Sequence, residues 1–265
     1  MRNRKAGAES RELQIAAADG HVVTGTLVCA GKGRMVIMSH GITGDRDEEG
    51  VHSGFAHLLS EHGFDSMRFD FRGRGKSAMA SRDATISGMM LDLMAVIDWG
   101  RKGYTGLFHV ATSFGAAITL LCARRFSFAD FSAVAFWNPV VDFERVFVHP
   151  STEWGRKYFG HVDLQDIPRQ AGITLSNGKI TVGPRMMMEL VVMTPGETAW
   201  PPSPPLLMVH GDEDSCAPFE DSQTYAGSNA VTAALHRLPG VDHGFGERLS
   251  EAYAVTLDWF NENKH

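Results

Sequence analysis

The sequence is poor in cysteine, with three residues among 265: Cys29, Cys122 and Cys216. Because an odd number of widely separated thiols does not form a disulfide framework, we expect a reducing compartment. The sequence also lacks a long hydrophobic run, and no segment approaches the roughly 20 apolar residues that span a membrane. Residues 1–5 are largely basic, but residues 6–19 supply no hydrophobic stretch of the kind found in a signal peptide. We therefore expect a cytoplasmic protein without a membrane span.

Basic charge is scarce as well. Lys and Arg number 25 against 31 Asp and Glu, which gives a formal net charge of -6 at pH 7. A protein that binds nucleic acid needs a basic surface to neutralise phosphates, so nucleic acid is not an expected partner. The length of 265 residues suits one large α/β domain with a single core.

Short apolar runs alternate with segments of helical periodicity along the chain. A turn at Asp19-Gly20 predicts an amino-terminal hairpin. One helical face of residues 83–102 collects the apolar side chains of Ile86, Met89, Met90, Leu93, Met94 and Ile97. Further strands are expected at residues 65–70, 107–110, 133–137, 206–210 and 234–238, and a helix at 51–62. This alternation predicts a mainly parallel sheet with helices on both faces.

Ser113 lies in the segment ATSFG, residues 111–115, between an apolar strand and the apolar helical stretch 116–123. The pattern is typical of a nucleophile elbow, a sharp turn that strains and exposes the serine. Small residues flank such a serine because the strand and the helix nearly touch. Gly115 meets this need, and Ala111 replaces the usual glycine. Taken alone, the motif has an alternative interpretation, a serine that caps a helix N-terminus.

Asp214 and His243 follow Ser113 in loops that come directly after expected strands. Asp214 lies in the loop 211–218, and His243 lies in a Gly-containing loop after the strand 234–238. Loops at the carboxyl ends of parallel strands meet at one edge of the sheet, where an Asp can orient a catalytic His. The order Ser, Asp, His along the chain is that of α/β-hydrolases and differs from the orders in chymotrypsin and subtilisin.

Other acidic residues are rivals for the role of Asp214. Asp142 ends the preceding strand segment, a place from which some hydrolases of this kind supply the acid, so it stays open as the alternative. Asp212 and Asp242 are sequence neighbours of the chosen residues, but their offsets are expected to direct them elsewhere.

Two motifs upstream of the elbow follow expected strands. HGITG at residues 40–44 can supply the Ile42 amide to an oxyanion, with the Phe114 amide as the second donor. His40 is expected to shape this turn as a hydrogen-bonding residue. In DFRGRGKS at residues 70–77, Arg72 is expected to form a structural ion pair.

The remaining histidines are expected to be structural. His52, His57 and His62 recur at five-residue steps in one predicted helix, a spacing that does not stack metal ligands on one face, and we expect them to be solvent-exposed. His109, inside a strand, is expected to be a hydrogen-bonded core residue.

The motifs HGxxG, DxRGxGxS, small-x-Ser-x-small, HGxxDxxxP and DHG occur in this order over nearly the whole chain. The sequence thereby resembles the α/β-hydrolase superfamily. HGITG, DFRGRGKS and a cap narrow the resemblance to cinnamoyl-esterase-like carboxylesterases and the acyl-carrier thioesterase of luminous bacteria. It implies hydrolysis of an acyl ester or thioester through Ser113, His243 and Asp214, without a metal or organic cofactor. Ala111, Thr112 and Ala116 depart from the usual elbow and leave the subfamily open.

About sixty residues separate the strands 133–137 and 206–210, too many for one connecting helix. We expect a cap insertion at 143–204 on a core formed by 1–142 and 205–265. Asn177-Gly178 predicts a type I′ hairpin within it, and the prolines of 201–205 predict a stiff linker. Its candidate substrate-binding residues are Trp154, Tyr158, Phe159, Met187 and Met188. The alternative is that these side chains only pack the cap onto the core.

These observations predict a serine carboxylesterase or thioesterase. Its expected substrate is a small molecule with an apolar or aromatic acyl group, free or attached to a carrier. Carbon–carbon bond hydrolases, peptidases and perhydrolases use the same triad and remain alternatives, because a fold does not determine one function. A non-catalytic ligand-binding homologue is the alternative from a different class. The sequence leaves the oligomeric state open, a homodimer included.

Overall fold

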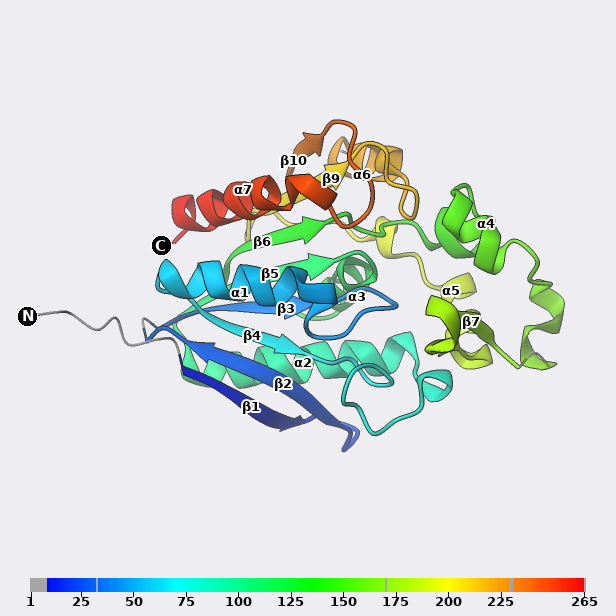
Figure 1. The fold of residues 1–265 in the computed structure, drawn as a ribbon, viewed down its shortest axis with the longest axis horizontal. Helices are drawn as coiled ribbons and strands as arrows, with labels where there is room; N and C mark the ends of the chain where they lie inside the picture. The colour runs from blue at the N-terminus through cyan, green and yellow to red at the C-terminus, as the bar shows by residue number, and fades with distance from the viewer. Residues whose placement is uncertain (1–8, 32, 170, 229–230, 265) are drawn as a thin grey trace, which may run out of the picture.

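The computed structural model describes residues 9–31, 33–169, 171–228 and 231–264. Its centre is an eight-stranded sheet with the strand order β1-β2-β4-β3-β5-β6-β9-β10 (Figure 1). The strands are β1 (Glu9–Ala16), β2 (Val22–Cys29), β3 (Arg34–Ser39), β4 (Asp65–Phe69), β5 (Gly106–Thr112), β6 (Phe131–Trp137), β9 (Leu206–Gly211) and β10 (Ala233–Leu238). β2 pairs antiparallel with β1 and with β4, and the pairs from β4 to β10 are parallel. The predicted hairpin and mainly parallel sheet are confirmed.

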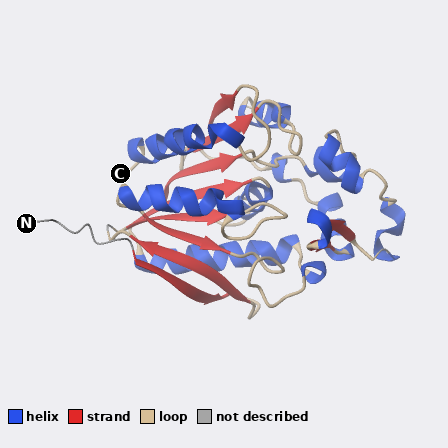
Figure 2. Ribbon diagram, viewed as in Figure 1, coloured by secondary structure: helices blue, strands red, loops and turns tan. Residues whose placement is uncertain are grey.

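Helices cover both faces of this sheet (Figure 2). One face carries α1 (Val51–Glu61) and α7 (Leu249–Glu262), and the other carries α2 (Ile86–Gly103), α3 (Phe114–Ala123) and α6 (Phe219–Ala226). Successive residues of a strand point to opposite faces, so a sheet covered on both sides needs continuous apolar runs. In β3, for example, Met35 and Ile37 join the core with α2, whereas Val36 and Met38 join the core with α1.

Between β6 and β9 the chain leaves the sheet and builds a layer beyond the carboxyl ends of the strands (Figure 1). Its elements are α4 (Glu153–Phe159), β7 (Ile173–Leu175), β8 (Ile180–Val182) and α5 (Pro184–Val192). This layer faces the edge of the sheet where the loops of Ser113, Asp214 and His243 begin. The segment is therefore in a position to cover that edge.

β7 and β8 form the expected hairpin, but its turn differs from the prediction. Strand pairing stops at Leu175 and Ile180, and a 3₁₀ turn at Ser176–Gly178 joins the strands. Ser176 has φ 51° and Gly178 has φ 94°, so the chain leaves the extended conformation one residue earlier than a two-residue turn requires. The type I′ prediction was wrong in turn type, although the turn does contain Asn177-Gly178.

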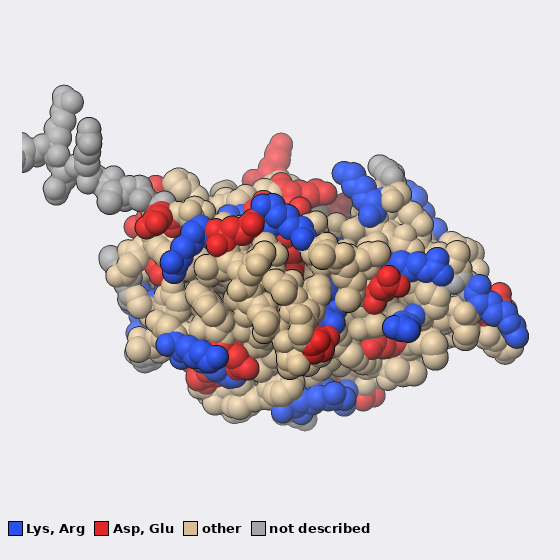
Figure 3. All heavy atoms as spheres, turned by 90° about the horizontal axis from the view of Figure 1, so that it is seen from below, with Lys and Arg blue, Asp and Glu red and all other residues tan. Residues whose placement is uncertain are grey.

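Charged side chains of both signs share the surface, and Lys and Arg are interspersed with Asp and Glu on the face drawn in Figure 3. Arg101, for example, pairs with Asp130 at 2.6 Å. Arg72 is buried and pairs with Asp92 at 2.8 Å and with Asp19 at 2.7 Å, which is the ion pair expected from the sequence. Within the described ranges, no helix has both the length and the apolar character to cross a membrane.

Candidate active site

The sharp turn between β5 and α3 places Ser113 at the carboxyl edge of the sheet. Ser113 has φ 52° and ψ -115°, a backbone conformation that a residue with a side chain adopts under strain. The turn is held by β6 and the residues after it, because the Ser113 amide donates to Trp137 O at 2.8 Å and the Ser113 carbonyl accepts from Val140 N at 3.1 Å. A Cβ atom on Gly115 would lie 2.7 Å from the Ser39 carbonyl oxygen. The strand, sharp turn and helix of an elbow are thus present, and the turn requires a glycine at its exit.

The Ser113 hydroxyl does not cap α3, whose N-terminus has no side-chain cap hydrogen bond. Ser113 Oγ lies 3.1 Å from His243 Nε2, and His243 Nδ1 lies 2.7 Å from Asp214 Oδ2. Because a carboxylate only accepts hydrogen bonds, Nδ1 carries the proton and Nε2 is left to accept the serine hydroxyl. This geometry contradicts the helix-cap alternative and allows His243 to remove the Ser113 proton.

The Asp214 side chain is buried and accepts hydrogen bonds from four donors, one of which is His243. Its Oδ1 accepts from the amides of Cys216 and Ala217, each at 2.8 Å, and its Oδ2 accepts from His210 Nε2 at 3.1 Å as well as from His243. Burial alone would raise the pKa of this carboxyl, but the charge of His243 and the hydrogen bonds from both histidines outweigh it and hold the pKa well below its usual range. Asp214 is therefore an ionised carboxylate aimed at His243.

The other acidic residues face away from the ring of His243. Asp142 Oδ1 accepts from the Glu144 amide at 2.8 Å, and Asp142 lines a separate cavity of about 580 Å³ between α5 and α6. Asp212 pairs with Arg237. Asp242 Oδ1 accepts from the backbone amides of Ser215 and His243, so it ties the two loops together without contacting the imidazole. The structure places only Asp214 against the imidazole among these four carboxylates.

His210, at the carboxyl end of β9, is a site residue that was not predicted from the sequence. Its Nε2 lies 3.1 Å from Asp214 Oδ2 and 3.2 Å from the Ala217 carbonyl oxygen, both of which are acceptors, so Nε2 carries the proton. Nδ1 then accepts from Ser222 Oγ at 2.7 Å. The signal was present as the His of HGxxDxxxP, four residues before Asp214. His210 thus shares Asp214 Oδ2 with His243 and helps to hold the carboxylate in place.

His243 has an environment suited to a base. Burial alone would lower its pKa, but the Asp214 carboxylate opposes this effect, and Glu48 and Asp242 add to it, so the net shift of the pKa is upward. A histidine with a raised pKa is a stronger base, and it holds its proton to a higher pH.

Ile42 and Phe114, the expected oxyanion-hole donors, flank Ser113 on two loops. Phe114 is the first residue of α3, where a backbone amide has no acceptor within the helix. The Ile42 amide makes no hydrogen bond to the described part of the chain. Neither amide has an acceptor among the described residues, and their role as oxyanion donors stays a prediction.

The loop that carries Ile42 is held by the two motifs predicted from the sequence. His40 Nε2 accepts from the Phe71 amide at 3.1 Å, which leaves Nδ1 to donate to the Gly41 carbonyl oxygen at 2.7 Å. Burial lowers the pKa of His40 to about 4, so this ring is neutral. Arg74 Nε donates to the Ile42 carbonyl oxygen at 2.6 Å. His40 therefore makes structural hydrogen bonds, as expected, and the DFRGRGKS turn holds the HGITG loop.

One prediction for the other histidines was wrong. His52 is fully buried and bonds to Thr112 Oγ1 at 2.8 Å, because it lies on the face of α1 that packs on the sheet. His57 and His62 are exposed, as expected. His109 is buried, with its Nε2 2.9 Å from Thr119 Oγ1, which agrees with a hydrogen-bonded core residue.

A cavity of about 400 Å³ opens in front of Ser113 and His243. Its lining includes the apolar side chains of Val140, Val146, Phe147, Trp154 and Phe245. It also includes Gly41 and the polar residues Thr43, Glu48, Thr112 and Asn138. Apolar walls with a few polar groups are typical of a small-molecule site.

Of the five cap residues expected to bind substrate, the structure brings Trp154 to this cavity. Tyr158 packs on Trp154, with ring centroids 5.3 Å apart, and does not line the cavity. Phe159 and Met187 are buried in the hydrophobic cluster that also contains side chains of the central sheet, and Met188 has 52% of its surface exposed. The packing alternative therefore describes Tyr158, Phe159 and Met187 better, whereas Met188 neither lines the cavity nor packs into the core.

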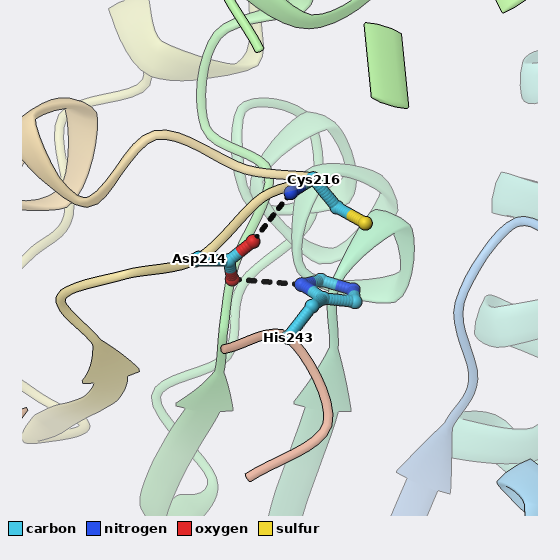
Figure 4. Close-up of side chains that lie close together, drawn as sticks. All are labelled: Asp214, Cys216 and His243. Atoms are coloured by element: carbon cyan, nitrogen blue, oxygen red, sulfur yellow. Dashed lines mark hydrogen bonds and ion pairs between the residues drawn. The ribbon is translucent and has the colours of Figure 1, made fainter. Parts of the chain in front are cut away.

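Cys216 lies beside the histidine and the acid (Figure 4). One possible ligand atom from each of Asp214, Cys216 and His243 lies within 4.8 Å of the others, a spacing that could hold a metal ion. Burial and the charge of Asp214 raise the pKa of the Cys216 thiol to about 12, however, so it is a poor thiolate ligand at neutral pH. Figure 4 shows the Asp214 carboxylate between the Cys216 amide and the His243 ring, an arrangement that suits proton transfer through His243.

Comparison with known families agrees with this geometry. The family described as serine aminopeptidase, S33, matches residues 32–166, about half of the chain, including the HGITG loop and the elbow. The chain belongs to this family. The protein is thus an α/β-hydrolase, as the motifs predicted. A comparison with curated proteins finds no match.

Solved structures with the same fold include several hydrolases. Est1E from Butyrivibrio proteoclasticus with ferulic acid bound superposes with a TM-score of 0.79 at 21% identity, covering 95% of this chain and 98% of that chain. The α/β-hydrolase GrgF from Penicillium sp. sh18 has a TM-score of 0.76 at 17% identity, covering 96% and 99%. The esterase Pf2001 of Pyrococcus furiosus has a TM-score of 0.74 at 16% identity, covering 100% and 94%. At these identities the similarity establishes the fold of the protein. It does not identify the substrate, which has to be inferred from the residues of the site.

Proposed function

We propose that this α/β-hydrolase cleaves carboxylic esters, and thioesters by the same steps, through a covalent acyl-enzyme on Ser113. The observation that carries the proposal is the unbroken hydrogen-bond chain from Ser113 Oγ through His243 to Asp214, with contacts of 3.1 and 2.7 Å, in front of a cavity. Serine is a weak nucleophile until a neighbouring base accepts its proton. His243 is positioned for that transfer.

The proposed reaction has two halves. Ser113 Oγ attacks the acyl carbon while His243 Nε2 takes its proton, and the Ile42 and Phe114 amides bind the negative oxygen of the tetrahedral intermediate. His243 then gives the proton to the leaving alcohol or thiol, whose bond to the acyl carbon breaks. A water molecule repeats the sequence on the acyl-enzyme and releases the acid. Asp214 stays ionised and keeps the proton-bearing Nδ1 of His243 in place.

The acyl group would lie against the apolar side chains that line the cavity. Val146, Phe147 and Trp154 come from residues 143–204, which we propose act as a cap on a core formed by 1–142 and 205–265. Aromatic walls favour a flat or apolar acyl group. Est1E, a structure with the same fold, was solved with ferulic acid bound, which supports an aromatic acyl group as one candidate.

Labelling with a fluorophosphonate tests this proposal directly, because the reagent reacts with an activated serine. The wild type should gain one adduct, located on Ser113 by peptide mapping, and Ser113→Ala should gain none. A panel of p-nitrophenyl esters and acyl thioesters should then be hydrolysed by the wild type and not by the variant. An unlabelled wild type that hydrolyses none of them would favour a ligand-binding homologue.

A further inference from the structure

A second carboxylate, that of Glu48, faces the same cavity as Ser113 and His243. Its Oε2 accepts the Gly41 amide at 2.8 Å. Its Oε1 has no hydrogen-bond partner among the described residues. Unlike Asp214, Glu48 therefore keeps one oxygen available to a substrate, and the steps proposed above assign it no role.

The HGITG loop is shaped around this carboxylate. A Cβ atom on Gly44 would collide with Oε2, and one on Gly41 would lie 3.1 Å from Oε1 and 3.4 Å from Ser113 Cβ. Gly41 thus lies between the Glu48 carboxylate and the Ser113 side chain. Gly41 and Gly44 of the HGITG motif make room for an acidic side chain next to the nucleophile.

The backbone is strained at Glu48 and at the residue after it. Glu48 has φ 45° and Glu49 has φ 53°, left-handed conformations that cost energy in residues other than glycine. Two such residues in succession persist only when the surrounding structure fixes them, and strained backbone of this kind clusters at functional sites. The strain therefore points to a use for the carboxylate.

Glu48 and Glu49 supply the carboxyl groups that line the cavity, and no Lys or Arg is among the described residues beside them in the lining. The pKa of Glu48 is raised to about 7, mainly by burial. The hydrogen bond from the Gly41 amide and the charge of His243 lower this pKa, and the negative charges of Asp45 and Glu49 raise it. Above that pH the Glu48 carboxylate is ionised. Because it is half-buried, it attracts a positive charge more strongly than a carboxylate in water does. Trp154 supplies an aromatic ring that can also contact a cation.

We infer that Glu48 determines charge specificity, so that the site prefers substrates that carry an ammonium group near the reacting carbonyl and disfavours substrates with a carboxylate there. The inference rests on the proposed ester hydrolysis and names its substrate class. An ammonium group can donate a charge-assisted hydrogen bond to Glu48 Oε1 while the carbonyl carbon lies at Ser113 Oγ. A hydrogen bond to a charged group in this setting corresponds to about 10- to 100-fold in kcat/KM.

The experiment compares three ethyl esters of similar length that differ in terminal charge: β-alanine ethyl ester, ethyl butyrate and monoethyl succinate. At pH 8 the wild type should hydrolyse the ammonium ester at least about tenfold more efficiently than the carboxylate ester. Glu48→Gln keeps an oxygen that can accept the Gly41 amide and removes the charge, so this ratio should fall by at least about tenfold while ethyl butyrate is still hydrolysed. Glu48→Asp, which restores the charge, should retain part of the preference. Glu61→Gln, the same change at an exposed position on α1, should leave the ratio at the wild-type value.

A second measurement does not depend on turnover. Boronic acids that carry an ammonium group, a methyl group or a carboxylate should protect Ser113 from fluorophosphonate labelling in that order of potency, and Glu48→Gln should abolish the order. Equal charge preference in the wild type and Glu48→Gln, by either measurement, would overturn the inference and leave ester hydrolysis standing. Absence of both labelling and hydrolysis in the wild type would instead overturn the proposed function, and the inference with it.

Discussion

Replacing Asp214 by Asn tests which acid orients His243. The Cys216 and Ala217 amides both donate to Asp214 Oδ1, so the oxygen of the new amide should take that side. The amide NH₂ would then face His243 Nδ1 and favour the tautomer that carries its proton on Nε2. Such a ring donates to Ser113 and cannot accept its proton. The expected loss in kcat is about 10⁴-fold, or about 5 kcal/mol of activation free energy.

Asp142→Asn is the matched comparison, because Asn can accept the same amide hydrogen bonds at the start of the cap. It should change kcat by less than about threefold. Both variants should be assayed with one p-nitrophenyl ester and checked for folding by circular dichroism. The rate of fluorophosphonate labelling should fall in parallel with kcat for Asp214→Asn. A folded Asp214→Asn enzyme that keeps more than a tenth of the wild-type kcat, or a larger loss in Asp142→Asn, would refute the assignment.

Three further outcomes are expected. Because the pKa of His243 is raised and the base must be unprotonated, kcat/KM should fall on acidification with a midpoint above about 6.5, and a flat profile from pH 5 to 8 would argue against a histidine base. Trp154→Ala should lower kcat/KM for aromatic esters by about tenfold or more, whereas Met188→Ala, at an exposed cap position, should not, as an ester panel would show. Gly115→Ala should force the elbow away from β3, so thermal unfolding should show a loss of about 1–3 kcal/mol in the free energy of unfolding and the rate should fall.

The parts of the site that could be predicted are those that depend on short, local stretches of sequence. The turn at Ser113 needs small residues within two positions on either side, and the loops of Asp214 and His243 directly follow apolar runs. A parallel sheet brings the carboxyl ends of its strands to one edge, so a correct sheet prediction was enough to expect these residues together. Their contacts in the structure agree with that expectation.

The misses within helices have a different cause, which is that the sequence does not show which face of a helix packs on the rest of the protein. Five-residue spacing correctly indicated that His52 and His57 do not share one side of α1, but it could not tell which of them faces the sheet. His52 does, and it bonds to Thr112, sixty positions away. In α5, Met187 and Met188 are adjacent, yet one is buried and the other exposed, because a helix turns by about 100° per residue. The residue type shows that such side chains are apolar. It does not show whether they face the protein interior or the solvent.

Asp214 and Glu48 show how the fold gives two carboxyl groups near one histidine opposite properties. Asp214 accepts two backbone amides and two imidazoles, and these donors lower its pKa although it is buried. Glu48 accepts one amide and is otherwise surrounded by protein and by other acidic groups, so its pKa rises to about 7. The first carboxylate stays charged and orients His243 throughout the proposed cycle, whereas the second changes charge near neutral pH and meets the substrate. Since ionised Glu48 also raises the pKa of His243, the charge of the preferred substrate and the strength of the base depend on the same side chain.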